Sequence, residues 1–204
     1  MGNGFGMTSY RLHEVLVASA RPTAELWRLI LAILLIVAGF LALNVAYFQS
    51  LASLPVWGSL RRELQDGSSA RAIWVMLGNF VPLLVVSLIV AFLVNGRTPG
   101  QLLGPLRLFW FDFRRVARLA LVLFFVVFLI PMPLDSQPVA NMGFGAWIGL
   151  LPISLVLVLV QVSTEEILFR GYLQSQLAAR FSSPLVWMIL PSLLFGALHY
   201  EPST

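Results

Sequence analysis

Long apolar stretches separated by short polar segments dominate the chain. A stretch of about 20 apolar residues matches the hydrocarbon thickness of a bilayer, and in lipid its backbone groups must be satisfied within a helix. The pattern therefore predicts an all-α, polytopic transmembrane helical bundle with about five spans, of which the third is short. The expected spans are Leu26–Phe48, Ile73–Val94, Val116–Ile130, Leu151–Ala179, and a last one from Leu185 to beyond Tyr200.

The segment between the second and third apolar stretches has a different character. It reads NGRTPGQLLGPLRLFWFDFRR over residues 95–115 and combines glycine, proline, aromatic residues and arginine. Aromatic and basic residues are typical of the boundary between membrane and water. We expect this segment to lie on the membrane surface before the chain enters the bilayer again.

Composition supports a membrane protein and excludes several other classes. The 204 residues are 59% hydrophobic and 11% charged, whereas soluble domains have about 25% charged residues. The absence of cysteine excludes a disulfide framework, a thiolate metal site and a cysteine nucleophile. The net charge of +4 is spread over loops, so the sequence predicts no nucleic-acid partner.

The placement of arginine predicts the orientation in the membrane. With the amino terminus inside, nine arginines lie on the cytoplasmic side, and three, Arg61, Arg62 and Arg71, lie outside, as the positive-inside rule requires. Residues 1–25 lack the apolar core of a signal peptide, and we interpret them as a cytoplasmic amino-terminal tail in which His13 is solvated.

Two adjacent glutamates and an arginine follow directly on the fourth apolar stretch, in QVSTEEILFRGYLQ over residues 161–174. Charges within a membrane are costly and mark functional candidates. Glu166 and Arg170 are spaced i,i+4, so they can form an ion pair on one helical face. Glu165 is turned about 100° away from Glu166 on a helix of 3.6 residues per turn, which leaves its carboxylate free.

The second candidate is His199 in SLLFGALHY, on the last apolar stretch. Glu165 precedes Ala179 by 14 positions and His199 follows Pro184 by 15, with RFSS as the turn between them. At 1.5 Å per residue both groups lie about 21 Å from that turn, so an antiparallel hairpin brings them to one level. A carboxylate and an imidazole that meet at one level can activate a water molecule for hydrolysis.

These residues carry a family resemblance. The pattern EEILFR, followed about 30 residues later by FGALH, resembles the EExxxR and FxxxH motifs of the CPBP family of intramembrane proteases. That family includes CaaX prenyl endopeptidases and bacterial Abi proteins linked to bacteriocin processing and self-immunity. Gly171 and the NGRTPGQLLGP loop are also similar to bacterial members.

The resemblance implies an intramembrane endopeptidase that hydrolyses a membrane-embedded peptide or protein. Glu165 would be the water-activating base, Glu166 and Arg170 would support it, and His199 would complete the water site. Residues 26–204 would form the protease domain, incomplete because the third family motif is absent, and we expect the chain to be truncated at its carboxyl terminus. The expected location is the plasma membrane of a bacterium, with the amino terminus cytoplasmic.

Several alternatives stay open beside this interpretation. The charged cluster can be a structural ion pair at a helix end, and the protein can be a non-proteolytic scaffold, an immunity factor or a proton-coupled transporter. No cofactor is predicted. The family is often described as metalloproteases, but a catalytic zinc needs three protein ligands, and the motifs offer one of the two glutamates and His199. Asn44, Asn79 and Gln161 are interpreted as contacts between helices.

Overall fold

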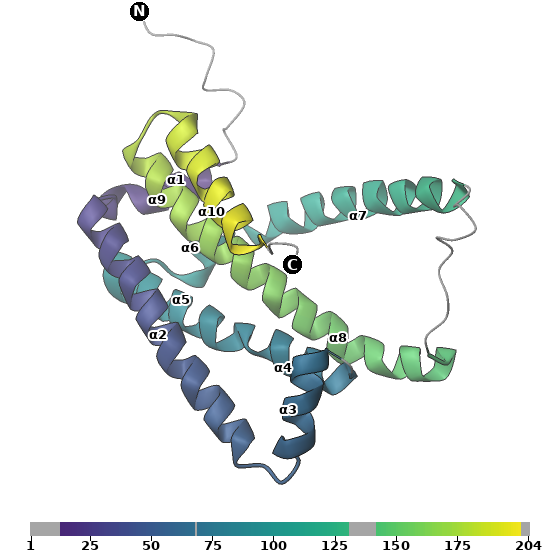
Figure 1. The fold of residues 1–204 in the computed structure, drawn as a ribbon. Coiled ribbons are helices and arrows are strands. Elements are labelled where there is room, and N and C mark those ends of the chain that lie inside the picture. Colours follow the sequence, from purple (N-terminus) through teal and green to yellow (C-terminus); the bar gives the residue numbers. More distant parts are fainter. Residues whose placement is uncertain (1–12, 68, 131–141, 201–204) are drawn as a thin grey trace, which may run out of the picture.

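The computed structural model describes residues 13–67, 69–130 and 142–200. Within these ranges the regular secondary structure is helical and no strand occurs (Figure 1). The predicted all-α fold class is confirmed. The α-helices are α1 (Glu14–Ala20), α2 (Leu26–Ala52), α3 (Trp57–Asp66), α4 (Ala70–Gly78), α5 (Phe80–Asn95), α6 (Pro99–Leu103), α7 (Leu106–Leu129), α8 (Phe144–Glu165), α9 (Ser175–Arg180) and α10 (Leu190–Leu198). The other helical segments are the 3-10 helix η1 (Arg21–Thr23) and the π-helices η3 (Glu166–Gln174) and η4 (Leu185–Ile189).

Three helical stretches in the described residues are long and apolar enough to cross a membrane: Leu26–Ala52, Ala70–Asn95 and Phe144–Arg180. They correspond to the first, second and fourth predicted spans, and the protein is an integral membrane protein. The second stretch consists of α4 and α5. The third is one continuous helix made of α8, η3 and α9, and it begins seven residues before the predicted start at Leu151.

The other two predicted spans have different boundaries in the structure. Helix α7 begins at Leu106 instead of Val116 and runs without a break through the aromatic and arginine-rich segment. Residues 106–115 of the predicted surface segment and most of the predicted third span therefore form one helix. The last apolar stretch is helical from Leu185 to Leu198, so the helix ends before Tyr200 and not beyond it.

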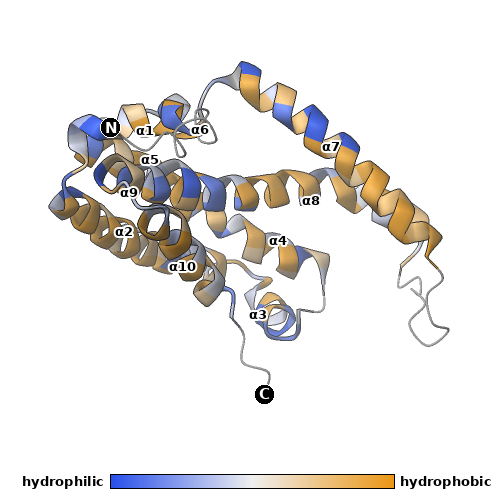
Figure 2. Cartoon of the chain, turned by 90° about the horizontal axis from the view of Figure 1, so that it is seen from above, coloured by the Kyte–Doolittle hydropathy of each residue, from blue (hydrophilic) through white to orange (hydrophobic). Residues whose placement is uncertain are grey.

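The core lies between α2, α5 and η3. Apolar side chains of α2, such as Leu29 and Ile36, pack with Val86 and Val90 of α5, while Ile167 joins them from η3. Figure 2 shows that α2 is hydrophobic along most of its length. Much of that apolar surface remains exposed in the absence of lipid, as expected of helices whose outer faces contact a bilayer.

Polar contacts between the helices accompany this packing. The Nδ2 of Asn44 on α2 donates a hydrogen bond to the Oδ1 of Asn79, at 2.9 Å. This confirms the predicted role of both residues as contacts between helices. The indole of Trp74 on α4 donates to the Oγ of Ser154 on α8 at 2.9 Å, which joins the second and third spanning stretches.

The part of the predicted amino-terminal tail that the structure describes is folded against the rest of the chain. Helix α1 packs against α9 and α6. The His13 ring stacks on Trp187 of η4, with 5.1 Å between ring centroids and 20° between planes. Burial lowers the pKa of His13, against the opposing effect of Glu14. The interpretation of His13 as a solvated residue is therefore wrong.

Arg97, in the loop between α5 and α6, is the most deeply buried cation among the described residues, with 1% of its surface exposed. Its guanidinium donates hydrogen bonds to Ser175 Oγ at 2.7 Å, Ser19 Oγ at 3.0 Å, Gln101 O at 3.2 Å and Leu16 O at 3.3 Å. Burial lowers its pKa to about 10, which leaves it charged at neutral pH. Arg97 thus connects α1 and α6 to α9.

Helix α6, which follows Arg97, contacts η3 at a glycine. A Cβ atom added at Gly171 would lie 2.6 Å from the carbonyl oxygen of Leu102, closer than any normal carbon contact. The two features that resemble bacterial members of the family, this glycine and the NGRTPGQLLGP loop, therefore pack directly against each other.

Gly171→Ala is expected to destabilise the protein by about 1–3 kcal/mol, because α6 or η3 must shift to make room for the methyl group. The measurement is thermal unfolding in detergent. Gly149→Ala in α8 is the matched control, since no atom lies within 4 Å of its added Cβ and alanine favours a helix more than glycine does. Equal unfolding temperatures for the two variants would contradict the close approach.

Candidate active site

The charged cluster lies where the long third stretch changes its helical geometry. Glu165 is the last residue of α8, and Glu166 is the first residue of the π-helix η3. Wider π-type turns occur frequently at functional sites, where they alter the direction of side chains. Helix α10 lies against η3, so the segment with His199 passes beside the segment with the glutamates.

Glu165 lies close to His199, as the equal distances from the turn predict. The Oε1 of Glu165 is 3.7 Å from the Nε2 of His199. The same oxygen accepts a hydrogen bond from the Nε2 of Gln161 at 3.3 Å. The side chain of Glu165 is 16% exposed and that of His199 is 49% exposed, so the two groups meet at the edge of the bundle, with the carboxylate on the inner side.

A backbone contact fixes the orientation of the His199 ring. Its Nδ1 lies 2.8 Å from the carbonyl oxygen of Phe195. A carbonyl oxygen only accepts hydrogen bonds, so Nδ1 must carry the proton. In the neutral imidazole, Nε2 is then an acceptor that faces Glu165. Two acceptors at 3.7 Å cannot bond to each other, but one water molecule can donate a hydrogen to each of them.

Glu166 and Arg170 form the predicted i,i+4 ion pair, between Glu166 Oε1 and Arg170 Nη1. Both side chains are about half exposed, so the pair lies at the surface of η3 and not in the core. Glu166 is therefore held by an arginine while Glu165 faces a histidine. The structure brings all four predicted residues into one neighbourhood, as two pairs.

Arg170→Leu is expected to lower accumulation of the protein in membranes, because a carboxylate on a membrane-spanning helix loses its counter-charge. Quantitative blotting of membrane fractions measures this. The double variant Glu166→Gln/Arg170→Leu should recover much of the loss, since it removes the uncompensated charge. Arg180→Leu, at the exposed end of α9, serves as the control. If the double variant accumulates no better than Arg170→Leu, pairing is not what the arginine contributes.

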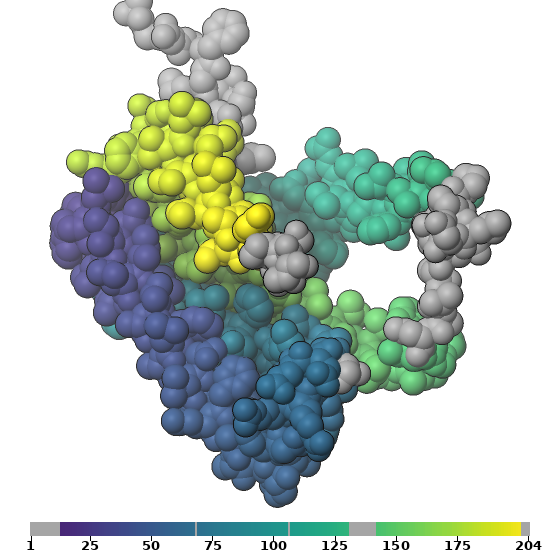
Figure 3. All heavy atoms as spheres, viewed as in Figure 1, coloured from purple at the N-terminus to yellow at the C-terminus, as the bar shows by residue number. Residues whose placement is uncertain are grey.

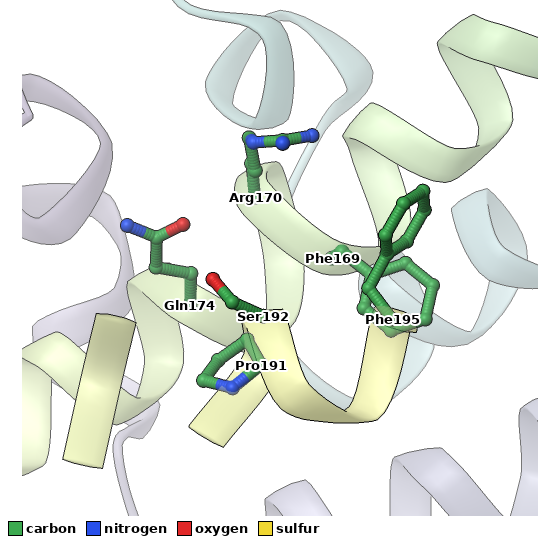
Figure 4. Close-up of a pocket in the computed structure, with 6 residues that line it drawn as sticks. All are labelled: Phe169, Arg170, Gln174, Pro191, Ser192 and Phe195. Atoms are coloured by element: carbon green, nitrogen blue, oxygen red, sulfur yellow. The ribbon is translucent and has the colours of Figure 1, made fainter. Parts of the chain in front are cut away.

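Two aromatic rings near His199 also line a small pocket. Phe169 of η3 meets Phe195 of α10 edge to face at 5.1 Å between centroids, and Phe195 lies 4.3 Å from the His199 ring. Both phenylalanines also line a pocket of about 70 Å³ between η3 and α10. Figure 4 shows its lining residues, Phe169, Arg170, Gln174, Pro191, Ser192 and Phe195. The pocket therefore combines an aromatic wall with polar groups beside the proposed water site.

The side chains at this site do not match a catalytic zinc site. Such a site uses three protein ligands and one open position. Among the described residues, no group of three His, Cys, Asp or Glu side chains lies close enough together to hold a metal ion. Glu165 and His199 supply two ligands, and Gln161, the side chain that donates a hydrogen bond to Glu165, is an amide.

Two contributors to this site were not identified from the sequence. Gln161 was interpreted as a contact between helices, but it bonds to Glu165 on its own helix, and its i,i+4 spacing from Glu165 could have indicated this. The hydroxyl of Tyr172 donates to the Oδ1 of Asn95 at 2.5 Å, which anchors η3 to the end of α5. No local pattern predicts that contact, because the two residues are far apart in the sequence.

Comparison with known proteins supports the resemblance. Residues 145–203 match the family model described as type II CAAX prenyl endopeptidase, Rce1-like. This segment contains both glutamates, Arg170 and His199. The match confirms the resemblance to the CPBP family, because this segment of the chain is similar to the Rce1-like model.

A curated relative adds a second match. The uncharacterized protein YyaK of Bacillus subtilis (strain 168) is 35% identical over 66 residues, which are 32% of this chain and 22% of the relative. The chain thus aligns with about a fifth of the length of that relative. No solved structure matches the chain.

Proposed function

We propose that this protein is an intramembrane endopeptidase that hydrolyses a membrane-borne peptide or protein segment with a water molecule activated by Glu165 and His199. The observation that carries the proposal is the 3.7 Å separation between Glu165 Oε1 and His199 Nε2, with the ring oriented by Phe195. The Rce1-like match over the same segment supports a peptide-bond hydrolase.

The proposed reaction begins with a water that donates one hydrogen to each acceptor, so that its oxygen lone pairs point away from both. As this oxygen bonds to the carbonyl carbon of the scissile peptide, Glu165 takes one proton. His199 retains its hydrogen bond to the attacking oxygen. When the carbon–nitrogen bond breaks, the protonated Glu165 returns its proton to the leaving amine, and the carboxylate is restored.

Each neighbour of the glutamate has a defined task in this scheme. Gln161 donates to the same carboxylate oxygen that faces His199, which restrains the rotamer of Glu165. The ion pair with Arg170 holds Glu166 away from the water, so that one glutamate acts as the base and the other has a structural role.

The proposed substrate is membrane-borne because the site lies on a helix of spanning length. A prenylated CAAX peptide is a candidate by the description of the family model, and other membrane peptides fit the same chemistry. The proposed location is the plasma membrane of a bacterium, with the amino terminus in the cytoplasm, in keeping with the bacterial source of the relative.

The test is to incubate the full chain in proteoliposomes with a panel of membrane peptides, prenylated and unprenylated, and to identify products by mass spectrometry. Cleavage at a defined bond is the expected result. Retained peptide binding without cleavage of any substrate would favour a scaffold or immunity factor. Proton flux across the same vesicles, without cleavage, would favour a transporter.

A further inference from the structure

Helix α7 differs from the other long helices because it stands apart from the bundle. Figures 1 and 3 show it extending from α6 along its own direction, with open space between it and α8. Its side chains are exposed along most of its length. The proposed catalytic residues lie on other helices, so the proposed function does not account for its surface.

The two halves of α7 have opposite chemistry, as the colours in Figure 2 show. Residues 119–129 are apolar throughout, and Phe128 is 83% exposed. At 1.5 Å per residue this half is roughly 16 Å long, about half the thickness of the hydrocarbon core. It can enter one leaflet but cannot cross the bilayer alone. The first half of the same helix is thereby held near the headgroups.

The first half carries four exposed arginines, Arg107, Arg114, Arg115 and Arg118, and one acid, Asp112. At 100° per residue, Arg107, Arg114 and Arg118 lie within about 40° of one another and form a stripe along one face. Arg115 flanks this stripe. Exposed aromatic rings, those of Phe109, Trp110, Phe111 and Phe113, share this half of the helix.

These four arginines also lack counter-charges. In the described ranges no carboxylate lies within ion-pair distance of any of them, whereas Arg21, Arg28, Arg71 and Arg170 each have one. Two of the four instead donate to carbonyls of their own helix, Arg114 to Trp110 and Arg118 to Arg114. The stripe is thus an uncompensated positive surface at the level of the headgroups.

From this placement we infer that the first half of α7 is a binding surface for the headgroups of anionic phospholipids, with Arg107, Arg114 and Arg118 as its main contacts. Guanidinium groups bind phosphate in a fork geometry, and aromatic rings at the interface hold the helix at this depth. An acidic substrate segment could complement the same charges, but it would not explain the exposed apolar half that continues the helix into hydrocarbon.

The test uses the full chain in phosphatidylcholine vesicles that contain either brominated phosphatidylglycerol or brominated phosphatidylcholine. Quenching of Trp110 fluorescence is the readout, isolated by subtracting the signal of Trp110→Phe. The parent should prefer phosphatidylglycerol, and the preference should fall several-fold at about 0.5 M salt, because exposed charges are screened. The salt response needs no variant and therefore does not depend on how a variant folds.

In the triple variant Arg107→Gln/Arg114→Gln/Arg118→Gln, the preference for phosphatidylglycerol should fall at least tenfold. Each arginine near an anionic surface strengthens binding about fivefold. The matching triple lysine variant should retain most of it. Arg61→Gln/Arg62→Gln in α3, which removes two other exposed arginines, is the control and should behave like the parent.

An unchanged lipid preference in the triple glutamine variant would overturn the inference, as would an equal loss in the α3 control. If the parent shows no preference for phosphatidylglycerol, and the glutamine variant instead cleaves acid-flanked peptides more slowly, the surface binds substrate and not lipid. Lipid preference is measured without any cleavage assay. The proposed protease function and the proposed lipid-binding surface can therefore each be rejected without rejecting the other.

Discussion

Glu165→Gln is expected to lower the rate of peptide cleavage by about 100-fold or more, the usual contribution of a general base. Glutamine keeps the shape of the side chain and can still contact Gln161 and His199, but it cannot take a proton from water. Peptide binding should survive, because the substitution removes a proton acceptor and changes the volume of the side chain very little. The measurement is the initial rate with detergent-solubilised protein and a membrane peptide, together with binding of the same peptide.

A remote carboxylate provides the control for this comparison. Asp66→Asn removes an exposed acid at the end of α3 with the same change in charge and should leave the rate unchanged. If Glu165→Gln cleaves at the parental rate, Glu165 is not the base. The scaffold and transporter alternatives would then become the better explanations of the site.

The sequence predicted the positions of the first, second and fourth spans because hydrophobic length is a local property. Helix α2 begins at Leu26 as expected, and the long stretch with the glutamates ends at Arg180, next to the predicted Ala179. The proximity of Glu165 and His199 could also be predicted, since an antiparallel hairpin with a short turn converts residue counts into depth. Both predictions depend on regular geometry along one helix or between two neighbours.

The features that the sequence did not predict depend on contacts between distant segments. Arg97 belongs to the segment that was expected to lie on the membrane surface, but α1, α6 and α9 enclose it and supply its hydrogen-bond acceptors. His13 is covered by Trp187, which lies far along the chain. Hydropathy records neither contact. The π-helical geometry of η3 is also hidden, because the residues from Glu166 to Gln174 contain no signal that distinguishes it from an α-helix.

The close packing at Gly171 links the ion pair, which local spacing predicts, to a contact between distant segments, which it does not. The π-helix η3 carries Glu166 and Arg170 on one side and approaches the backbone of Leu102 on another. Helix α6, which contains Leu102, is in turn held by the hydrogen bond from Arg97 to Gln101. The helix that carries the ion pair is therefore held by groups that take no part in the proposed chemistry, and substitutions in α6 should affect activity through the position of η3.

His199→Ala is expected to damage cleavage about as severely as Glu165→Gln, and the double variant should be little worse than either single variant. Residues that activate one water act as a unit, so removing the second has little further effect. Two independent contributions of about 100-fold each would instead multiply to about 10,000-fold in the double variant. The measurement is the cleavage rate of the parent, both singles and the double, with the same peptide and the same lipid.

His13→Ala is the matched control, since His13 is the other histidine of the chain and contacts Trp187 away from Glu165. It should retain the parental rate at a temperature where the protein remains folded. A multiplicative loss in the Glu165/His199 double variant would mean that the two side chains act on different steps. A single water held between Glu165 Oε1 and His199 Nε2 would then no longer explain the geometry that brings them to 3.7 Å.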